Sequence, residues 1–199
     1  MAVELRRPGL ARATRDIDLV LRNDLVADPA DAEQVRGLLL RALLDDVDGD
    51  RLTFALGPAT RLRDDIYQRP AWRFRVEAAL AGKPYPSMRL DVVARPEEVT
   101  GVEQLPLPDV LGFAGIRPRR VPVADSRQQY AEKLHALTRQ YEAGASSRVK
   151  DLVDMVMLVE DGVYPDRNLL LRVRHVFAVR GTHRVPDRLM DPPESWRLP

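Results

Sequence analysis

The sequence predicts an α+β protein in which a mixed or antiparallel sheet with flanking helices is followed by a C-terminal helical segment. Two observations support this class. Short runs of branched or alternating apolar residues, separated by glycine and proline, dominate the first 124 residues. Helical periodicity takes over from Asp125. We therefore expect an α/β core over residues 1–124 and a helical segment with a proline-rich tail over residues 125–199.

The elements of the first part follow from their periodicity. Residues 16–21 predict a strand, because branched apolar residues alternate with Asp16 and Asp18. Residues 29–44 predict a helix with Asp28 as its N-cap, since apolar residues recur at helical spacing after Pro29. Three further runs, divided by Gly and Pro, predict consecutive antiparallel strands over residues 51–56, 72–80 and 88–94.

The second part is read in the same way. Residues 96–122 are rich in proline and weakly periodic, which indicates a connection crossing the sheet with short extended pieces at 105–111 and 120–123. Helices are expected over 126–141, 147–160 and 166–179, and an extended tail after Gly181. In the middle helix, the expected apolar stripe consists of Val149, Leu152, Val156 and Val159.

Composition limits the class of protein. The 199 residues are 45% hydrophobic and 31% charged, which is typical of a globular protein with a real core. With 31 basic and 30 acidic residues, the net charge excludes attraction of the whole surface to nucleic acid. The chain has no cysteine and no apolar run of ~18 residues, so we expect no membrane span and a location in the reducing cytoplasm.

Lysine is scarce in this chain. Of the 31 basic residues, only Lys83, Lys133 and Lys150 are lysines, which leaves 28 arginines. Lysine and arginine differ chemically, because the ammonium is a compact point charge and the guanidinium is a planar fork. A lysine is therefore more informative here than usual. Three histidines, His135, His175 and His183, lack metal-ligand spacing and are expected to be structural or exposed.

The first candidate chemistry lies in the strand around Asp16 and Asp18. Residues two apart on a strand lie roughly 6.7 Å apart on one face, so the two carboxylates repel by about 2.5 kcal/mol at an effective dielectric of 20. A solvated cluster with Arg12, Arg15 and Arg22 would compensate for this repulsion without any catalytic role. Asp91 lies within another apolar strand and favours a metal-binding site over this solvated cluster, because three carboxylates on neighbouring strands suit Mg²⁺.

Four segments, in order, resemble the motifs of the AbiEii/AbiGii-type (MenT-like) nucleotidyltransferase toxin family. They are Met1–Arg6, Arg12–Leu19 with its Thr-Arg-Asp-Ile-Asp-Leu core, Glu132–Leu137, and Ser147–Asp154 with its Arg-x-Lys-Asp-x-x-Asp sequence. The resemblance implies a nucleotidyltransferase fold and a toxin of a toxin–antitoxin or phage-defence system. It further implies transfer of a nucleotide from a nucleoside triphosphate, with Mg²⁺ or Mn²⁺, to an acceptor that is expected to be the 3′ end of tRNA.

The resemblance also assigns roles to residues. It implies catalytic roles for Asp16, Asp18, Lys133 and Asp151, metal binding by Asp16, Asp18 and Asp91, and nucleotide binding by Lys133, Arg148 and Lys150. Thr14 is a candidate for silencing by phosphorylation, because a dianion beside two carboxylates would oppose binding of metal and nucleotide. Ordinary alternatives stay open: an exposed helix lysine at 133, surface ion pairs among Arg148, Asp151 and Asp154, and a turn-capping hydroxyl at Thr14.

One expected feature of the family has no counterpart in this sequence. Family members place a helix and a Gly-Gly or Gly-Ser turn before the aspartates, and the N–H groups of that turn cradle the triphosphate. Gly9 is the single glycine before Asp16 and does not match the motif. The expectation is an upstream start codon or a truncated chain. The leading hypothesis is an enzyme with a cognate antitoxin, in which Arg61, Arg63, Arg117, Arg119 and Arg120 hold tRNA phosphates. The alternative is a non-catalytic remnant that binds nucleotide, RNA or an antitoxin.

Overall fold

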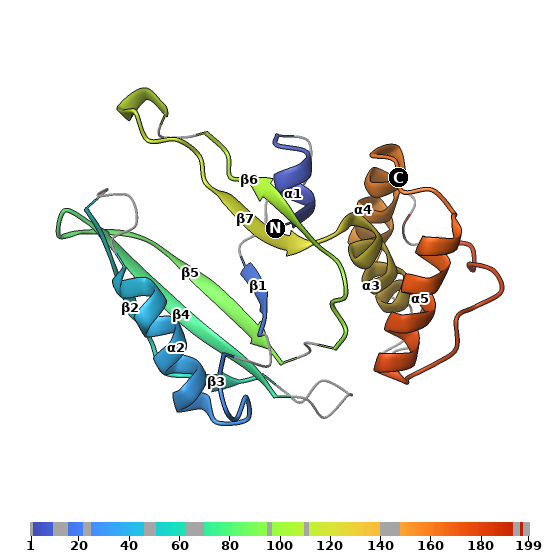
Figure 1. Cartoon of the computed structure of the whole chain (residues 1–199), viewed down its shortest axis with the longest axis horizontal. Coiled ribbons are helices and arrows are strands. Elements are labelled where there is room, and N and C mark those ends of the chain that lie inside the picture. Colours follow the sequence, from blue (N-terminus) through green and yellow to red (C-terminus); the bar gives the residue numbers. More distant parts are fainter. Residues whose placement is uncertain are drawn as a thin grey trace. The chain divides into compact units, whose positions relative to one another are not determined.

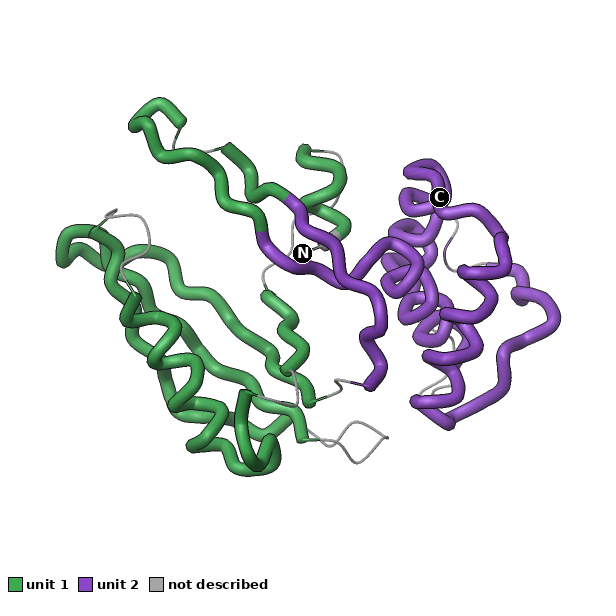
Figure 2. The backbone as a smooth tube through the Cα atoms, in the orientation of Figure 1, with its two compact units in different colours: residues 1, 3–96, 106–120 green, residues 2, 97–105, 121–199 purple. Residues whose placement is uncertain are grey.

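The protein has mixed helix and strand content, which confirms the α+β class (Figure 1). The computed structural model describes residues 2–9, 16–21, 25–45, 51–62, 70–94, 97–109, 112–139, 148–192 and 196. The chain forms two compact units (Figure 2). The first contains residues 1, 3–96 and 106–120, and the second contains residues 2, 97–105 and 121–199.

The first unit is built on a five-stranded sheet with the order β1-β5-β4-β2, in which β3 also pairs with β4. β1 and β5 are parallel, and the pairs β4–β5, β2–β4 and β3–β4 are antiparallel, as expected for consecutive strands. The strands are β1 (Asp16–Val20), β2 (Leu52–Leu56), β3 (Thr60–Arg61), β4 (Ala71–Leu80) and β5 (Lys83–Val93).

Helix α2 (Ala32–Leu44) covers one face of this sheet (Figure 1). Its buried Val35 packs in one cluster with Phe74 and Val76, which alternate along β4 and are almost fully buried. The helix begins one turn later than expected. Asp31, not Asp28, is the N-cap, because its side chain accepts hydrogen bonds from the backbone N–H groups of residues 33 and 34. The other face of the sheet has no such apolar cluster among the described residues and carries the charged side chains.

The hairpin of β4 and β5 extends further than the sequence indicated. β5 begins at Lys83 rather than Met88, and Lys83 pairs with Leu80 across a turn at Ala81 and Gly82, both with positive φ. The first part of β5 is exposed and contains Pro84, so it has no apolar alternation to reveal it. The pairing to β4 is therefore a tertiary property.

The second unit contains three helices, α3 (Ser126–Thr138), α4 (Val149–Glu160) and α5 (Arg167–Arg180). Asp125 and Asp166 cap α3 and α5 by accepting backbone hydrogen bonds, and Gly181 ends α5 in the left-handed conformation. The predicted apolar stripe of α4 is wrong. The buried apolar side chains are Met155 and Leu158, whereas Val149, Val156 and Val159 are exposed. Helix α4 has apolar residues on two sides, and the spacing of apolar residues in the sequence does not indicate which side packs against the rest of the protein.

Two short strands, β6 (Val102–Pro106) and β7 (Arg120–Ala124), pair as a separate two-stranded sheet. The extended piece at 120–123 is thus confirmed, whereas this pairing was not predicted for the proline-rich connection. A short 3-10 helix, η1 (Gly112–Ala114), lies between β6 and β7 in the sequence. A short α-helix, α1 (Ala2–Arg6), precedes β1. Among the described residues, no helix is long and apolar enough to span a membrane.

Candidate active site

The acidic residues of β1 lie on the face of the sheet opposite α2. Ile17 and Leu19 pack against the apolar core, and because strand side chains alternate, Asp16 and Asp18 point the other way. The prediction that both aspartates share one face is confirmed. The side chain of Asp16 is about one-third exposed as a whole, but its Oδ1 is buried.

The parallel register of β1 and β5 adds a third carboxylate to that face. Asp18 is the direct partner of Asp91, and Asp16 is the partner of Arg89. Partners in register on adjacent strands present their side chains to the same face. The three aspartates of the expected metal site therefore occupy neighbouring backbone positions on one face.

Two arginines on the same face are paired with these carboxylates. Nε of Arg89 lies 2.6 Å from Oδ1 of Asp16. Arg73, opposite Asp91 on β4, donates through Nε at 2.7 Å and through Nη2 at 2.6 Å to the two oxygens of Asp91. The latter is a bidentate pair, which is the stronger and more specific geometry. Sequence reasoning missed both arginines because their partners depend on strand register.

Arg73 lies in the field of all three carboxylates. Its hydrogen bond to Asp91 raises the pKa of its guanidinium above the ordinary value. Burial acts in the opposite direction, while attraction to Asp91, Asp16 and Asp18 raises the pKa further. The acidic face, meaning the face of the sheet that carries Asp16, Asp18 and Asp91, thus favours a positive charge at its centre. In this structure the guanidinium of Arg73 supplies that charge.

The donor set fits Mg²⁺ through Asp16 and Asp18. In the described part of the chain, no three acidic or imidazole side chains are placed so that they could hold one metal ion. Mg²⁺ needs fewer protein ligands, because it is commonly held by one or two carboxylates and completes its shell with water and substrate phosphates. Asp91 commits both oxygens to Arg73 in this structure, and its role as a metal ligand stays a prediction.

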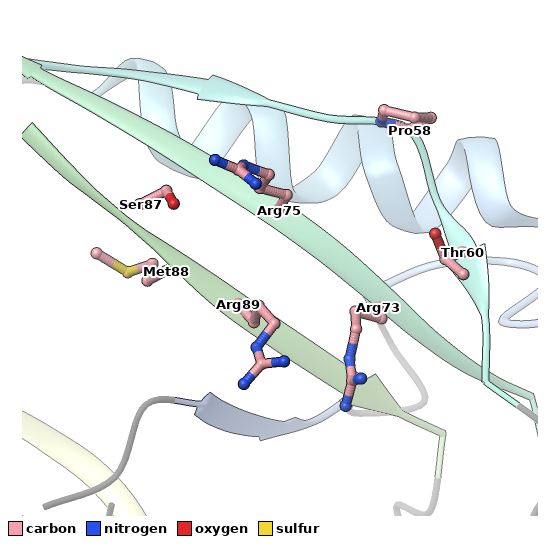
Figure 3. A pocket seen from close by; sticks show the side chains of 7 residues that line it. All are labelled: Pro58, Thr60, Arg73, Arg75, Ser87, Met88 and Arg89. Atoms are coloured by element: carbon pink, nitrogen blue, oxygen red, sulfur yellow. The ribbon is translucent and has the colours of Figure 1, made fainter. Parts of the chain in front are cut away.

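An open pocket lies beside these carboxylates on the same face (Figure 3). Its volume is about 710 Å³, and it is lined by Pro58, Thr60, Arg73, Arg75, Ser87, Met88 and Arg89. Figure 3 shows the guanidinium ends of Arg73 and Arg89 turned toward β1, the grey-blue strand below them in the view. The wall is therefore rich in guanidinium and hydroxyl groups.

The second group of predicted residues lies in the second unit, where α3 and α4 pack together. Nζ of Lys133 is 2.5 Å from Oδ2 of Asp154 and 3.5 Å from Oδ1 of Asp151. Arg148 reaches the other oxygen of Asp151 at 3.4 Å. The side chain of Lys133 is 19% exposed, so it is not an ordinary surface lysine. Lys150 is exposed.

Asp154 was not among the predicted site residues. Its side chain is buried and its partner is Lys133. The available signal was the spacing of Asp151 and Asp154, three apart on one helix, which places both carboxylates on a common face. The expectation of surface ion pairs fits Arg148 with Asp151, but Asp154 belongs to the packed side of α4.

The histidines form structural contacts. His135 is fully buried, its Nε2 lies 2.8 Å from the hydroxyl of Thr182, and its ring packs edge-on against Phe177. The ring of His183 is tilted against that of His135, with their centroids 4.6 Å apart. Burial lowers the pKa of His183 below the ordinary value, with a smaller contribution from the positive charge of Arg139. Nε2 of His175 lies 2.8 Å from the carbonyl oxygen of residue 97.

Some predicted residues lie outside the described part of the chain. They are the candidate phosphorylation residue Thr14, the arginines proposed to neutralise the aspartates (Arg12, Arg15 and Arg22), and one candidate RNA-binding residue, Arg63. The remaining candidates for RNA binding, Arg61, Arg117, Arg119 and Arg120, have exposed side chains.

Comparison with known proteins gives one assignment. No curated protein sequence matches this chain. The family model described as the nucleotidyl transferase AbiEii toxin of type IV toxin–antitoxin systems matches residues 1–198. This match covers the strand of Asp16 and Asp18, the Lys133 helix and the helix of Asp151 and Asp154. The chain belongs to the AbiEii nucleotidyltransferase toxin family.

Proposed function

We propose that this protein is a Mg²⁺- or Mn²⁺-dependent enzyme that transfers a nucleotide from a nucleoside triphosphate to the 3′ end of tRNA. The observation that carries the proposal is the register of β1 against β5, which sets Asp18 beside Asp91 and both on the open face of the sheet. Modification of the acceptor end would block aminoacylation and inhibit growth, and a cognate antitoxin would counter it.

The reaction needs an in-line exchange at the α-phosphorus. An oxygen–phosphorus bond forms from the RNA hydroxyl, the bond to the bridging oxygen of the β-phosphate breaks, pyrophosphate leaves, and the hydroxyl proton passes to water. Asp16 and Asp18 would hold the metal ion, which supplies nucleophile activation and stabilises charge on the phosphates.

The protein's cations would stabilise charge on the nucleotide. By the family motifs, Lys133 would contact the phosphates, and Arg148 and Lys150 would assist. A compact ammonium can neutralise a phosphate without fork geometry. Asp151 and Asp154 limit the rotamers of Lys133, because both carboxylates face its Nζ. Exposed arginines at 61, 117, 119 and 120 are candidates for the RNA backbone.

The test is transfer of label from each α-labelled nucleoside triphosphate onto total tRNA. The wild-type chain is compared with Asp18→Asn and with Asp28→Asn as a matched control, since Asp28 is exposed and lies outside the acidic face. We expect label with the wild type and the control, and none with Asp18→Asn. An acceptor other than tRNA would be identified by replacing tRNA with total RNA or protein.

A second candidate is binding without turnover, and the ion pairs of Asp16 and Asp91 with arginine favour it, because they occupy carboxylates that a metal ion would need. A thermal shift with Mg²⁺ and each nucleotide separates the two. Stabilisation by metal and nucleotide together, with transfer, supports the enzyme. Folded protein that binds nucleotide, RNA or antitoxin but transfers no label would establish the second candidate.

A further inference from the structure

The pocket on the open face of the sheet contains more positive charge than the expected metal site needs. Arg73 and Arg75 project from β4 and Arg89 from β5, with the hydroxyls of Thr60 and Ser87 nearby (Figure 3). Its volume of about 710 Å³ falls within the roughly 300–1,000 Å³ of small-molecule sites. Guanidinium and hydroxyl groups are donors that match phosphate oxygens. The pocket therefore fits a small ligand bearing phosphates.

The charge balance of this face depends on a divalent cation. Among the described residues, its three arginines stand beside the carboxylates of Asp16, Asp18, Asp91 and Glu77. A divalent cation at Asp16 and Asp18 adds two positive charges to this face. A polyanion is therefore attracted more strongly by the metal-bound face than by the metal-free face.

The three arginines differ in how firmly their partners hold them. Arg73 is clamped by both oxygens of Asp91. Arg89 meets Asp16 through Nε, and its side chain is about half exposed. Arg75 pairs with Glu77, and both side chains are about two-thirds exposed. Water screens exposed pairs, so the contact of Arg75 exchanges more readily than the bidentate pair. Arg89 approaches Asp16 through Nε at an oxygen that is itself buried, without the two-pronged geometry of Arg73.

We propose that this pocket binds the polyphosphate of the nucleotide, and that Arg89 exchanges Asp16 for a phosphate when a divalent cation takes that carboxylate. The inference rests on the proposed function, since it takes a nucleoside triphosphate as the ligand. Arg75 contacts the same ligand after leaving Glu77. Arg73 stays with Asp91 and contributes its charge. Cation and nucleotide then bind cooperatively, because each removes the obstacle to the other.

The first measurement is equilibrium binding of fluorescent α,β-methylene nucleoside triphosphates, which block transfer, with and without Mg²⁺. The variants are Arg75→Gln, Arg89→Gln and, as a matched control, Arg41→Gln on the exposed side of α2. Loss of a charge-assisted phosphate contact weakens binding by about tenfold or more, so we expect this for both pocket variants. Binding by Arg41→Gln should equal that of the wild type, and omission of Mg²⁺ should weaken wild-type binding.

The second measurement is Mn²⁺ binding in the absence of nucleotide, followed by electron paramagnetic resonance. Arg89→Gln should bind Mn²⁺ several-fold more tightly than the wild type, because Arg89 no longer competes for Asp16. Arg75→Gln should be unchanged. Tighter metal binding together with weaker nucleotide binding distinguishes the exchange of partners from a damaged sheet, which would weaken both.

The outcomes separate this inference from the proposed function. Wild-type protein that binds nucleotide, with equal affinity in both pocket variants, overturns the inference and leaves the proposed function intact. If the pocket variants bind RNA more weakly but bind nucleotide as the wild type does, the pocket belongs to the RNA acceptor, and the inference is also overturned. Wild-type protein that binds no nucleotide with Mg²⁺ overturns both.

Discussion

Nζ of Lys133 lies 2.5 Å from Oδ2 of Asp154, a carboxylate whose side chain is only 4% exposed. Asp151, the residue expected from the family motif, is the more distant partner at 3.5 Å. The pair joins α3 to α4 within the second unit. Lys133 is therefore held by a buried residue that contributes to folding as well as to the orientation of the ammonium.

Asp154→Asn should lower the free energy of unfolding by about 3 kcal/mol, because it leaves the partly buried ammonium of Lys133 with a single, longer ion pair. Urea unfolding followed by circular dichroism measures this. The control is Arg148→Gln, which removes an exposed pair with Asp151 and should cost about 0.5 kcal/mol or less. Equal stability of Asp154→Asn and wild type would show that Asp154 does not support the helix pair.

Asp18→Asn should abolish nucleotide transfer while leaving the fold as stable as before or more stable. Asp18 stands on one face with Asp16 and Asp91, so the substitution removes like-charge repulsion as well as the proposed metal ligand. We expect a loss of activity of about a hundredfold or more and an unchanged or raised melting temperature. A fall in melting temperature that matches the lost activity would contradict the functional assignment of this carboxylate.

The bidentate pair of Arg73 and Asp91 should be energetically coupled. Both residues lie in register on β4 and β5, and Asp91 is 13% exposed. A double-mutant cycle with Arg73→Gln and Asp91→Asn should give a coupling free energy of about 1–2 kcal/mol, allowing for the partly exposed guanidinium. The corresponding cycle for Arg75 and Glu77, whose side chains are both mostly exposed, provides the comparison and should give about 0.5 kcal/mol or less.

Stability should fall on mild acidification because of His183. Burial lowers the pKa of His183 in the folded protein below its ordinary value of 6.5. As pH falls through 6.5, the unfolded chain takes up a proton before the folded protein does, so the free energy of unfolding decreases until the folded pKa is passed. Stability is thus greatest above this window.

The measurement is the melting temperature of wild type and His183→Gln between about pH 8 and pH 5.5, a range in which histidine is the main side chain that titrates. Gln keeps a hydrogen-bonding group beside Thr138 and Thr182, which the imidazole contacts. The wild type should lose more stability than the variant on acidification. Identical pH profiles would show that His183 does not carry the effect.

Which side chains share a face within one element could be predicted from the sequence alone. Strand alternation placed Asp16 and Asp18 together, because neighbours two apart point the same way whatever the strand pairs with. Helix caps were less certain, because Asp31 caps α2 in place of the expected Asp28. The family likewise followed from motifs that can be read along the chain.

Beyond the antiparallel pairing of consecutive strands, the relationships between elements followed only from the tertiary structure. Asp18 meets Asp91, and Asp91 meets Arg73, through strand registers that local periodicity does not encode, since a shift by one residue would turn each side chain to the other face. The same holds for α4, where two apolar sides compete and packing buries Met155 and Leu158 together with Asp154. Local sequence sets the pattern of each element, but burial against distant residues selects the face and the partner.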